Sequence, residues 1–168
     1  MPINNPVLLL AACLALDTTL MAQSKTERTT LTDGKGRSAG SATTQITGSS
    51  ERTTIRDASG RTVGTATTRS SGSGAERTTF TDGQGRSTGS ATTYTTGTSE
   101  RTTFRDASGR TTGTATTRPS GSGSERTTLT DGKGRSTGSA TTQTSGGTER
   151  TTTRDAAGRT TGTATKRR

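Results

Sequence analysis

The charged residues of this chain recur at a fixed spacing, which makes them the first candidates for chemistry. A cassette beginning Glu-Arg-Thr-Thr occurs six times, at Glu27, Glu51, Glu76, Glu100, Glu125 and Glu149. Each cassette also carries one Asp and, four residues later, an Arg that follows a glycine. Paired carboxylates could act as general acid and base, but here a whole repeat separates each carboxylate from its counterpart. The chain has no histidine, which excludes imidazole catalysis and His-ligated metal sites.

The turn segments match neither a calcium loop nor a phosphate loop. A calcium loop needs several oxygen ligands within about a dozen residues, whereas segment 33–37 offers one carboxylate beside two cations. Segment 34–38 lacks the G-x-x-x-x-G-K-[ST] spacing of a phosphate loop. We therefore expect no enzyme activity, no metal site and no cofactor.

One candidate binding feature is a basic stripe. It consists of the arginines that follow the turn glycines: Arg37, Arg61, Arg86, Arg110, Arg135 and Arg159. The simplest interpretation is an ion pair with the Asp four residues earlier, which contributes at most about 1 kcal/mol when exposed. The alternative is a surface for polyanions such as lipopolysaccharide, supported by the net charge of +10 and the basic segment 166–168. Aromatic residues make up only 2% of the chain, too few for a stacking platform, so specific nucleic-acid recognition is not expected.

The other candidate feature is an array of hydroxyl side chains in Ser/Thr-Ala-Thr segments. Its members are Ser41, Thr43, Thr65, Thr67, Ser90, Thr92, Thr114, Thr116, Ser139, Thr141, Thr163 and Thr165. If the repeats stack, these residues form columns on one face, an arrangement that resembles the T-x-T rows of insect ice-binding β-solenoids. The resemblance implies ice binding, although Arg69 and Arg118 flank the row. Threonine is also a good strand residue in its own right.

Composition limits the fold to two states. Apolar residues are 21% of the chain, too few for a conventional core against a chain entropy of about 1–2 kcal/mol per residue. Low hydrophobicity with positive charge is typical of disorder. However, variation between the cassettes is graded by position, since Leu, Ile and Phe exchange at one slot and Ser and Thr at another. This grading favours an all-β repeat protein, with disorder as the alternative.

Each cassette reads as strand, tight turn, strand and looser connector. In segment 51–68, the run 53–55 and the run 65–68 favour strands, and Asp57 opens the turn between them. The alternation of side chains predicts an inner set of Thr53, Ile55, Gly64, Ala66 and Thr68. The tight turns need glycine at Gly36, Gly60, Gly85, Gly109, Gly134 and Gly158.

The outer set predicted for the same cassette is Arg52, Thr54, Arg56, Thr65 and Thr67. Because a β-branched residue is strained at positive φ, substitution of a turn glycine should be costly. Substitution of connector glycines such as Gly72 or Gly121 should be nearly silent.

Two topologies fit six strand-turn-strand units spaced 24 or 25 residues apart. The tight turns favour a meander of hairpins, while like residues in like slots favour a stacked β-solenoid, the arrangement we expect. Segments 55–61 and 104–110 resemble the Y-D-x-x-G-R core of YD repeats, found in bacterial cell-surface and toxin-shell proteins. The resemblance covers about six residues per cassette and lacks the tyrosine. It implies a β-hairpin repeat in an exported bacterial protein and no particular activity.

The first 22 residues differ from all that follow. Segment 7–16 is an apolar run of signal-peptide length, too short to span a bilayer. Cleavage after Ala22 would release a chain that begins at Gln23 and contains no transmembrane segment. Residues 10–13 also fit a bacterial lipobox, which would anchor the protein through Cys13, and an uncleaved apolar tail is a third alternative.

These features predict the following organisation and role. The expected parts are a signal peptide 1–22, a short segment 23–26, repeats 27–50, 51–75, 76–99, 100–124, 125–148 and 149–165, and a basic tail 166–168. The expected function is a non-enzymatic structural role at the bacterial surface or in the extracellular matrix, with self-association into fibres as one version. Ice binding and polyanion binding are the alternatives.

Overall fold

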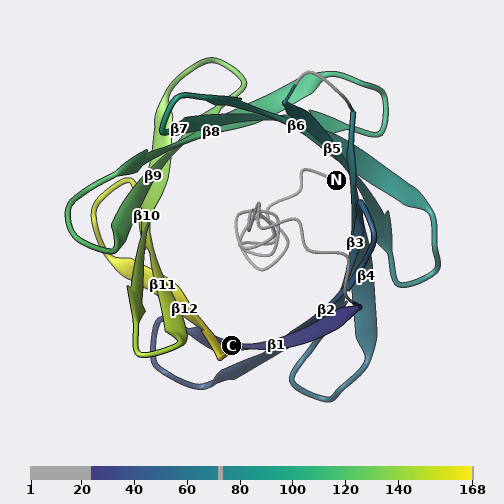
Figure 1. Ribbon diagram of the computed structural model, residues 1–168, viewed down its shortest axis with the longest axis horizontal. Helices are drawn as coiled ribbons and strands as arrows, with labels where there is room; N and C mark the ends of the chain where they lie inside the picture. Colours follow the sequence, from purple (N-terminus) through teal and green to yellow (C-terminus); the bar gives the residue numbers. More distant parts are fainter. Residues whose placement is uncertain (1–23, 72–73, 168) are drawn as a thin grey trace.

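The computed structural model describes residues 24–71 and 74–167, and this part of the chain is all β (Figure 1). The strands are β1 (Lys25–Asp33), β2 (Ser38–Thr47), β3 (Ser50–Arg56), β4 (Thr62–Ser70), β5 (Ala75–Asp82), β6 (Ser87–Thr96), β7 (Ser99–Asp106), β8 (Thr111–Pro119), β9 (Ser124–Asp131), β10 (Ser136–Ser145), β11 (Thr148–Asp155) and β12 (Thr160–Arg167). Each cassette thus contributes two strands. The expectation of a β-repeat is confirmed at this level.

The strands form one closed barrel. Each strand pairs antiparallel with its neighbours in sequence, and β12 pairs with β1 to close the ring. The predicted stack of solenoid coils is wrong, because like strands of successive cassettes are separated by an intervening strand instead of lying one upon another. The closure was not part of the meander alternative either. It pairs the two strands that an open sheet would leave with unpaired backbone groups.

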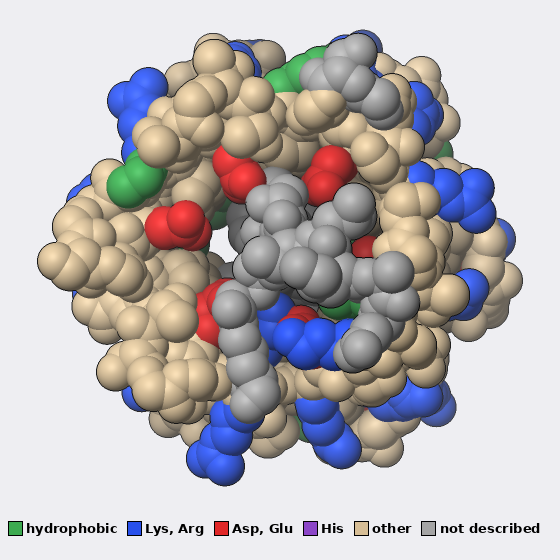
Figure 2. Space-filling model, in the orientation of Figure 1, with side chains coloured by type: hydrophobic (Ala, Val, Ile, Leu, Met, Phe, Trp, Pro, Cys, Tyr) green, Lys and Arg blue, Asp and Glu red, His purple; other side chains and the backbone are tan. Residues whose placement is uncertain are grey.

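Side chains alternate between the inside and the outside of the barrel. In β3 and β4 the predicted inner residues Thr53, Ile55, Gly64, Ala66 and Thr68 are all buried, which confirms this inner set. The space-filling view shows acidic side chains around the opening of the barrel, with a few basic ones beside them, and other basic side chains spread over the outer surface (Figure 2). Most of the basic side chains on the strands therefore lie outside, and the glutamates lie inside.

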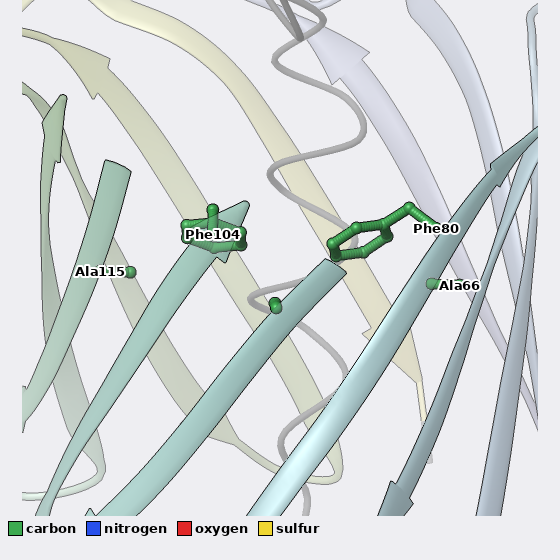
Figure 3. Packing of buried hydrophobic residues seen from close by; sticks show 5 residues of the cluster. Ala66, Phe80, Phe104 and Ala115 are labelled. Carbon is green, nitrogen blue, oxygen red and sulfur yellow. The ribbon is translucent and has the colours of Figure 1, made fainter. Parts of the chain in front are cut away.

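The core is a thin layer of small residues with a few larger ones. Phe80 and Phe104 project inward from β5 and β7 and pack with the alanines of the strands beside them (Figure 3). Glycines on the inner face allow the strands to approach closely. A Cβ on Gly89 would lie 2.2 Å from the backbone oxygen of Arg105, which no side chain could tolerate. Because the inner residues are small, the strand backbones pack closely, and this close packing takes the place of large apolar side chains.

The six tight turns share one design. In the first, the Asp33 amide donates to the Arg37 carbonyl at 2.9 Å, and the Gly36 amide donates to the Asp33 carbonyl at 3.0 Å. Asp33 Oδ1 accepts the amides of Lys35 and Arg37, both at 2.9 Å. The expected positive φ of the turn glycines is confirmed at Gly36, Gly60, Gly85, Gly109, Gly134 and Gly158.

The connectors between cassettes alternate in length. Residues 48–49 join β2 to β3, whereas residues 71–74 join β4 to β5. Because β2 has 10 residues and β4 has 9, the longer connector lengthens the spacing from 24 to 25 residues. The expectation that connector glycines are freely replaceable is wrong for Gly121, because its φ of 119° disfavours side chains. Gly72 lies outside the described residues. The shorter connectors are themselves tight turns.

Candidate functional site

One glutamate per cassette points into the barrel, near the end where the cassettes connect. These residues are Glu27, Glu51, Glu76, Glu100, Glu125 and Glu149. They lie two residues before a buried threonine on the same strand face, for example Thr102 after Glu100. Acidic side chains surround the opening in Figure 2. The odd-numbered strands therefore bring together carboxylates that a full repeat separates in the sequence.

The pKa of Glu100 is the most perturbed in this group. Burial, and then the charges of Glu125 and Glu76, raise the pKa of Glu100 to about 7. Burial also raises the pKa of Glu76. Neither carboxyl group has a hydrogen bond or an ion pair with another described residue. The Glu100 carboxyl group is consequently protonated in part of the molecules near neutral pH, which reduces the negative charge inside the barrel.

Glu27 behaves differently because it is paired. Its carboxylate forms ion pairs with Lys166 and, at 2.7 Å, with Lys25. Burial works to raise the pKa of Glu27, but hydrogen bonds from Lys166 and Lys25 outweigh it and hold the pKa below its usual value. Lys166 is itself only 4% exposed. Two residues of the expected basic tail 166–168, Lys166 and Arg167, belong to β12.

Lys166 occupies a slot that is threonine in the other cassettes. At five interfaces between cassettes or hairpins, inward threonines bond to each other, as in Thr68–Thr78 at 2.8 Å. The remaining pairs of this kind are Thr44–Thr53, Thr93–Thr102, Thr117–Thr127 and Thr142–Thr151. At the β12–β1 interface Lys166 faces Thr29 instead. The closing seam thus has an ion pair where the other interfaces have hydroxyl pairs.

The outer wall is basic. Among the described residues, every Glu points inward and every Asp lies at a tight turn, so the outward strand positions carry no carboxylate. Each odd-numbered strand carries an exposed arginine directly after its Glu: Arg28, Arg52, Arg77, Arg101, Arg126 and Arg150. A second exposed arginine follows on β7 and on β11, Arg105 and Arg154. Even-numbered strands add Arg69, Arg118 and Arg167, which are also exposed. Excess positive charge is therefore concentrated on the outside.

Three pairs of these arginines face each other directly across neighbouring strands. They are Arg69 with Arg77, Arg118 with Arg126, and Arg167 with Arg28. None of the six guanidinium groups has a hydrogen bond or ion pair with another described residue. Like charges directly opposite in an antiparallel pair are destabilising, so these positions cost the free barrel stability. We call them the arginine pairs.

The basic stripe predicted from the sequence lies elsewhere, in the tight turns at the other end of the barrel. Arg37, Arg86, Arg135 and Arg159 form ion pairs with their own turn aspartates. This confirms the ion-pair interpretation for these four. In the turns of Arg61 and Arg110 a serine hydroxyl donates to the Asp instead, from Ser59 at 2.7 Å and Ser108 at 2.6 Å.

Hydrogen bonds hold the pKa of the turn aspartates below its usual value. For Asp33 the largest contribution comes from the backbone amide of Arg37, and for Asp57 from the hydroxyl of Ser59. These carboxylates accept hydrogen bonds within their own turns, so few of their acceptor positions are left for a ligand.

The predicted hydroxyl array lies on the outer face of the even-numbered strands, and its members are half-buried. Each even-numbered strand carries two members, and an odd-numbered strand separates each such pair from the next. Some of the hydroxyls are also hydrogen-bonded to a threonine on the neighbouring strand, as in Thr65–Thr81 and Thr114–Thr130, both at 2.8 Å. The flat columns that a solenoid would have produced do not form. The array is instead distributed around a closed wall.

Other expectations concern features that the described residues do not contain. The signal peptide, the lipidation site Cys13 and cleavage after Ala22 lie outside the described residues. Residues 24–71 and 74–167 hold no group of three His, Cys, Asp or Glu side chains placed to bind a metal ion. No helix within them is long and apolar enough to cross a membrane.

Comparison with protein-family models, with curated proteins and with solved structures finds no match to this chain. The resemblance to YD repeats therefore stays a prediction. Function has to be inferred from the geometry of the barrel itself.

Three features of the site were not predicted from the sequence: the inward glutamates, the arginine pairs and the lysine at the closing seam. Strand parity placed Thr53 and Ile55 inside, and the same parity places Glu51 inside, two residues earlier on the face. The arginine pairs depend on which strands are neighbours. The expected β-solenoid would have given each strand different neighbours. Lys166 was visible as the one lysine in a threonine slot of the repeat.

Proposed function

We propose that this protein is an exported, non-enzymatic bacterial protein that binds anionic polymers at the cell surface or in the extracellular matrix. The arginine pairs on the outer wall are the observation that supports the proposal. A structural role at the surface follows if the barrel holds such polymers together. Lipopolysaccharide is a polymer of the required charge.

The physical argument concerns repulsion that a ligand would relieve. Two unit charges about 6 Å apart repel by about 0.7 kcal/mol in water, and no outward carboxylate among the described residues offsets this. A bound polyanion converts the repulsion into attraction and releases counterions. The inward position of the glutamates keeps their opposing charge on the far side of the wall.

The other candidate functions have less support. Fibre growth by strand addition needs an open edge, and the described sheet closes through β1 and β12. Ice binding needs a flat hydroxyl face, whereas the hydroxyl array encircles the barrel. Polyanion binding is therefore the function that the geometry favours.

Binding of heparin, a sulfated polysaccharide, tests the proposal. The full chain should bind with an affinity that falls steeply between 50 and 200 mM salt, as expected when several cations contact one polyanion. The wall variant Arg28→Thr/Arg77→Thr/Arg126→Thr should lose about tenfold or more at 100 mM salt. Threonine suits these positions because it favours strands.

A matched control separates the wall from net charge alone. The turn variant Arg37→Thr/Arg86→Thr/Arg135→Thr removes the same charge from arginines that already have aspartate partners. It should lose less than about threefold, because its arginines contribute little free charge. Equal losses in the two variants, or no heparin binding at 50 mM salt by the unaltered chain, would overturn the proposal.

A further inference from the structure

We infer that the three arginine pairs are three equivalent sites for phosphate monoester groups. This inference rests on the proposed binding of anionic polymers and names the chemical group that the wall would recognise. It assigns the ligand to three of the strand interfaces and not to the wall as a whole.

The three sites share one composition. Beside each arginine pair, two residues along the same strands, lies a pair of outward threonines: Thr67 with Thr79, Thr116 with Thr128, and Thr165 with Thr30. These six hydroxyls form no hydrogen bond with another described residue. Each site thus presents two guanidinium groups and two hydroxyl donors on adjacent strands. No carboxylate shares this face of the described barrel.

The remaining strand interfaces on the wall lack this composition. At the same slot of the repeat, Arg52 faces Gln45, Arg101 faces Tyr94, and Arg150 faces Gln143. Paired and single arginines therefore alternate around the barrel, following the alternation of long and short connectors. Successive arginine pairs are four strands apart, about 19 Å along the sheet at about 4.8 Å per strand. One small ligand cannot span two pairs.

The chemistry of the pair fits phosphate better than carboxylate. A phosphate monoester carries a charge of about −1.5 to −2 at pH 7 and three acceptor oxygens. Two arginines neutralise this charge, and each guanidinium can donate two parallel hydrogen bonds. A carboxylate has one charge and two oxygens, which a single arginine satisfies, so it would leave the second arginine still repelled. The pairs should consequently discriminate between these anions.

The test compares two ring-shaped ligands, each with six anionic groups, by isothermal titration calorimetry on the full chain. Inositol hexakisphosphate carries six phosphate monoesters, and benzenehexacarboxylate carries six carboxylates on a ring of similar size. The inference predicts three molecules of the hexakisphosphate per chain, bound about tenfold or more tightly than the hexacarboxylate. Equal affinities for the two probes, or no binding of the hexakisphosphate, would overturn it.

Charge-preserving variants locate the site. Arg28→Lys/Arg77→Lys/Arg126→Lys keeps every charge but removes the guanidinium fork from one member of each pair, and should weaken hexakisphosphate binding about tenfold. The matched control, Arg56→Lys/Arg105→Lys/Arg154→Lys, makes the same exchange at outward arginines that face Ser41, Ser90 and Ser139 and no residue of the three sites, and it should change binding less than twofold. Equal effects of the two variants would contradict the inference. Circular dichroism verifies folding, and the preference of the unaltered chain between the two anions decides the matter if a variant does not fold.

The outcomes also separate this inference from the proposed function. Heparin binding without any preference for the hexakisphosphate leaves the polyanion-binding function standing and removes the phosphate sites. Failure of the unaltered chain to bind either heparin or the hexakisphosphate removes both.

Discussion

The closing seam offers the sharpest test of how this barrel is held together. Replacing Lys166 with threonine restores the residue found in the other cassettes and removes the ion pair with Glu27. Both side chains of that pair are about 5% exposed, so Glu27 would keep a buried charge that is paired with Lys25. Lys25 is 52% exposed and contributes less.

The expected cost follows from these surroundings. Breaking a buried ion pair by removing one partner costs about 3–5 kcal/mol. The remaining contact with Lys25 reduces this cost, and a new hydroxyl pair with Thr29 would return about 1 kcal/mol. We therefore expect Lys166→Thr to lower the free energy of unfolding by about 2 kcal/mol at pH 7. Lys25→Thr should cost at most about 1 kcal/mol.

Urea denaturation with a double-mutant cycle measures this effect. Glu27→Gln combined with Lys166→Thr should be less destabilising than the sum of the single changes, with a coupling energy of about 2 kcal/mol. Because the folded pKa of Glu27 is lowered, its stabilisation is present above the unfolded pKa and is lost as the pH falls through the folded value. The cost of Lys166→Thr should shrink accordingly in acid. A coupling energy below about 0.5 kcal/mol at pH 7 would refute this reasoning.

Three further predictions concern the inward carboxylates, the inner glycines and the core. Glu100→Gln should stabilise the barrel by about 1–2 kcal/mol at pH 8 after allowance for solvent screening. The raised pKa of Glu100, about 7, means that its stabilising contribution is present below the unfolded pKa and is lost as the pH rises through 7; denaturation at pH 4 should therefore show no gain. Gly89→Ala should lower the melting temperature more than Gly85→Ala, because its Cβ would meet a backbone oxygen at 2.2 Å whereas that of Gly85 meets nothing within 4 Å. Phe104→Ala should cost about 3–5 kcal/mol in urea denaturation, and a loss below 1 kcal/mol would contradict its place in the core.

Local features of the fold were predictable from the sequence because neighbouring residues determine them. Asp57 and Gly60 define a turn whatever the rest of the chain does, and the alternation around Ile55 defines an inner face. These two signals gave the hairpin and its buried side correctly.

Closure of the barrel was not predictable in this way. It depends on strand tilt and stagger summed over all six cassettes, and the repeat pattern is equally compatible with stacking. Since the arginine pairs exist only between particular neighbouring strands, they could not be recognised before the topology was known. The substitution of lysine for threonine at position 166 was the one sequence signal of the closing seam, and its meaning comes from its contact with Glu27.

The account depends above all on closure, because closure gives the sheet an inside for the glutamates and pairs Arg167 with Arg28. Cysteines introduced at Thr30 and Thr165, in a Cys13→Ser background, would face each other across β1 and β12. Thr114 lies on β8, away from this seam, so Thr30→Cys with Thr114→Cys serves as the control. A short thiol crosslinker should join the first pair within one chain, and mass spectrometry should find no such link in the control. Crosslinks only between chains, or none at the seam, would contradict the closed barrel and the charge separation derived from it.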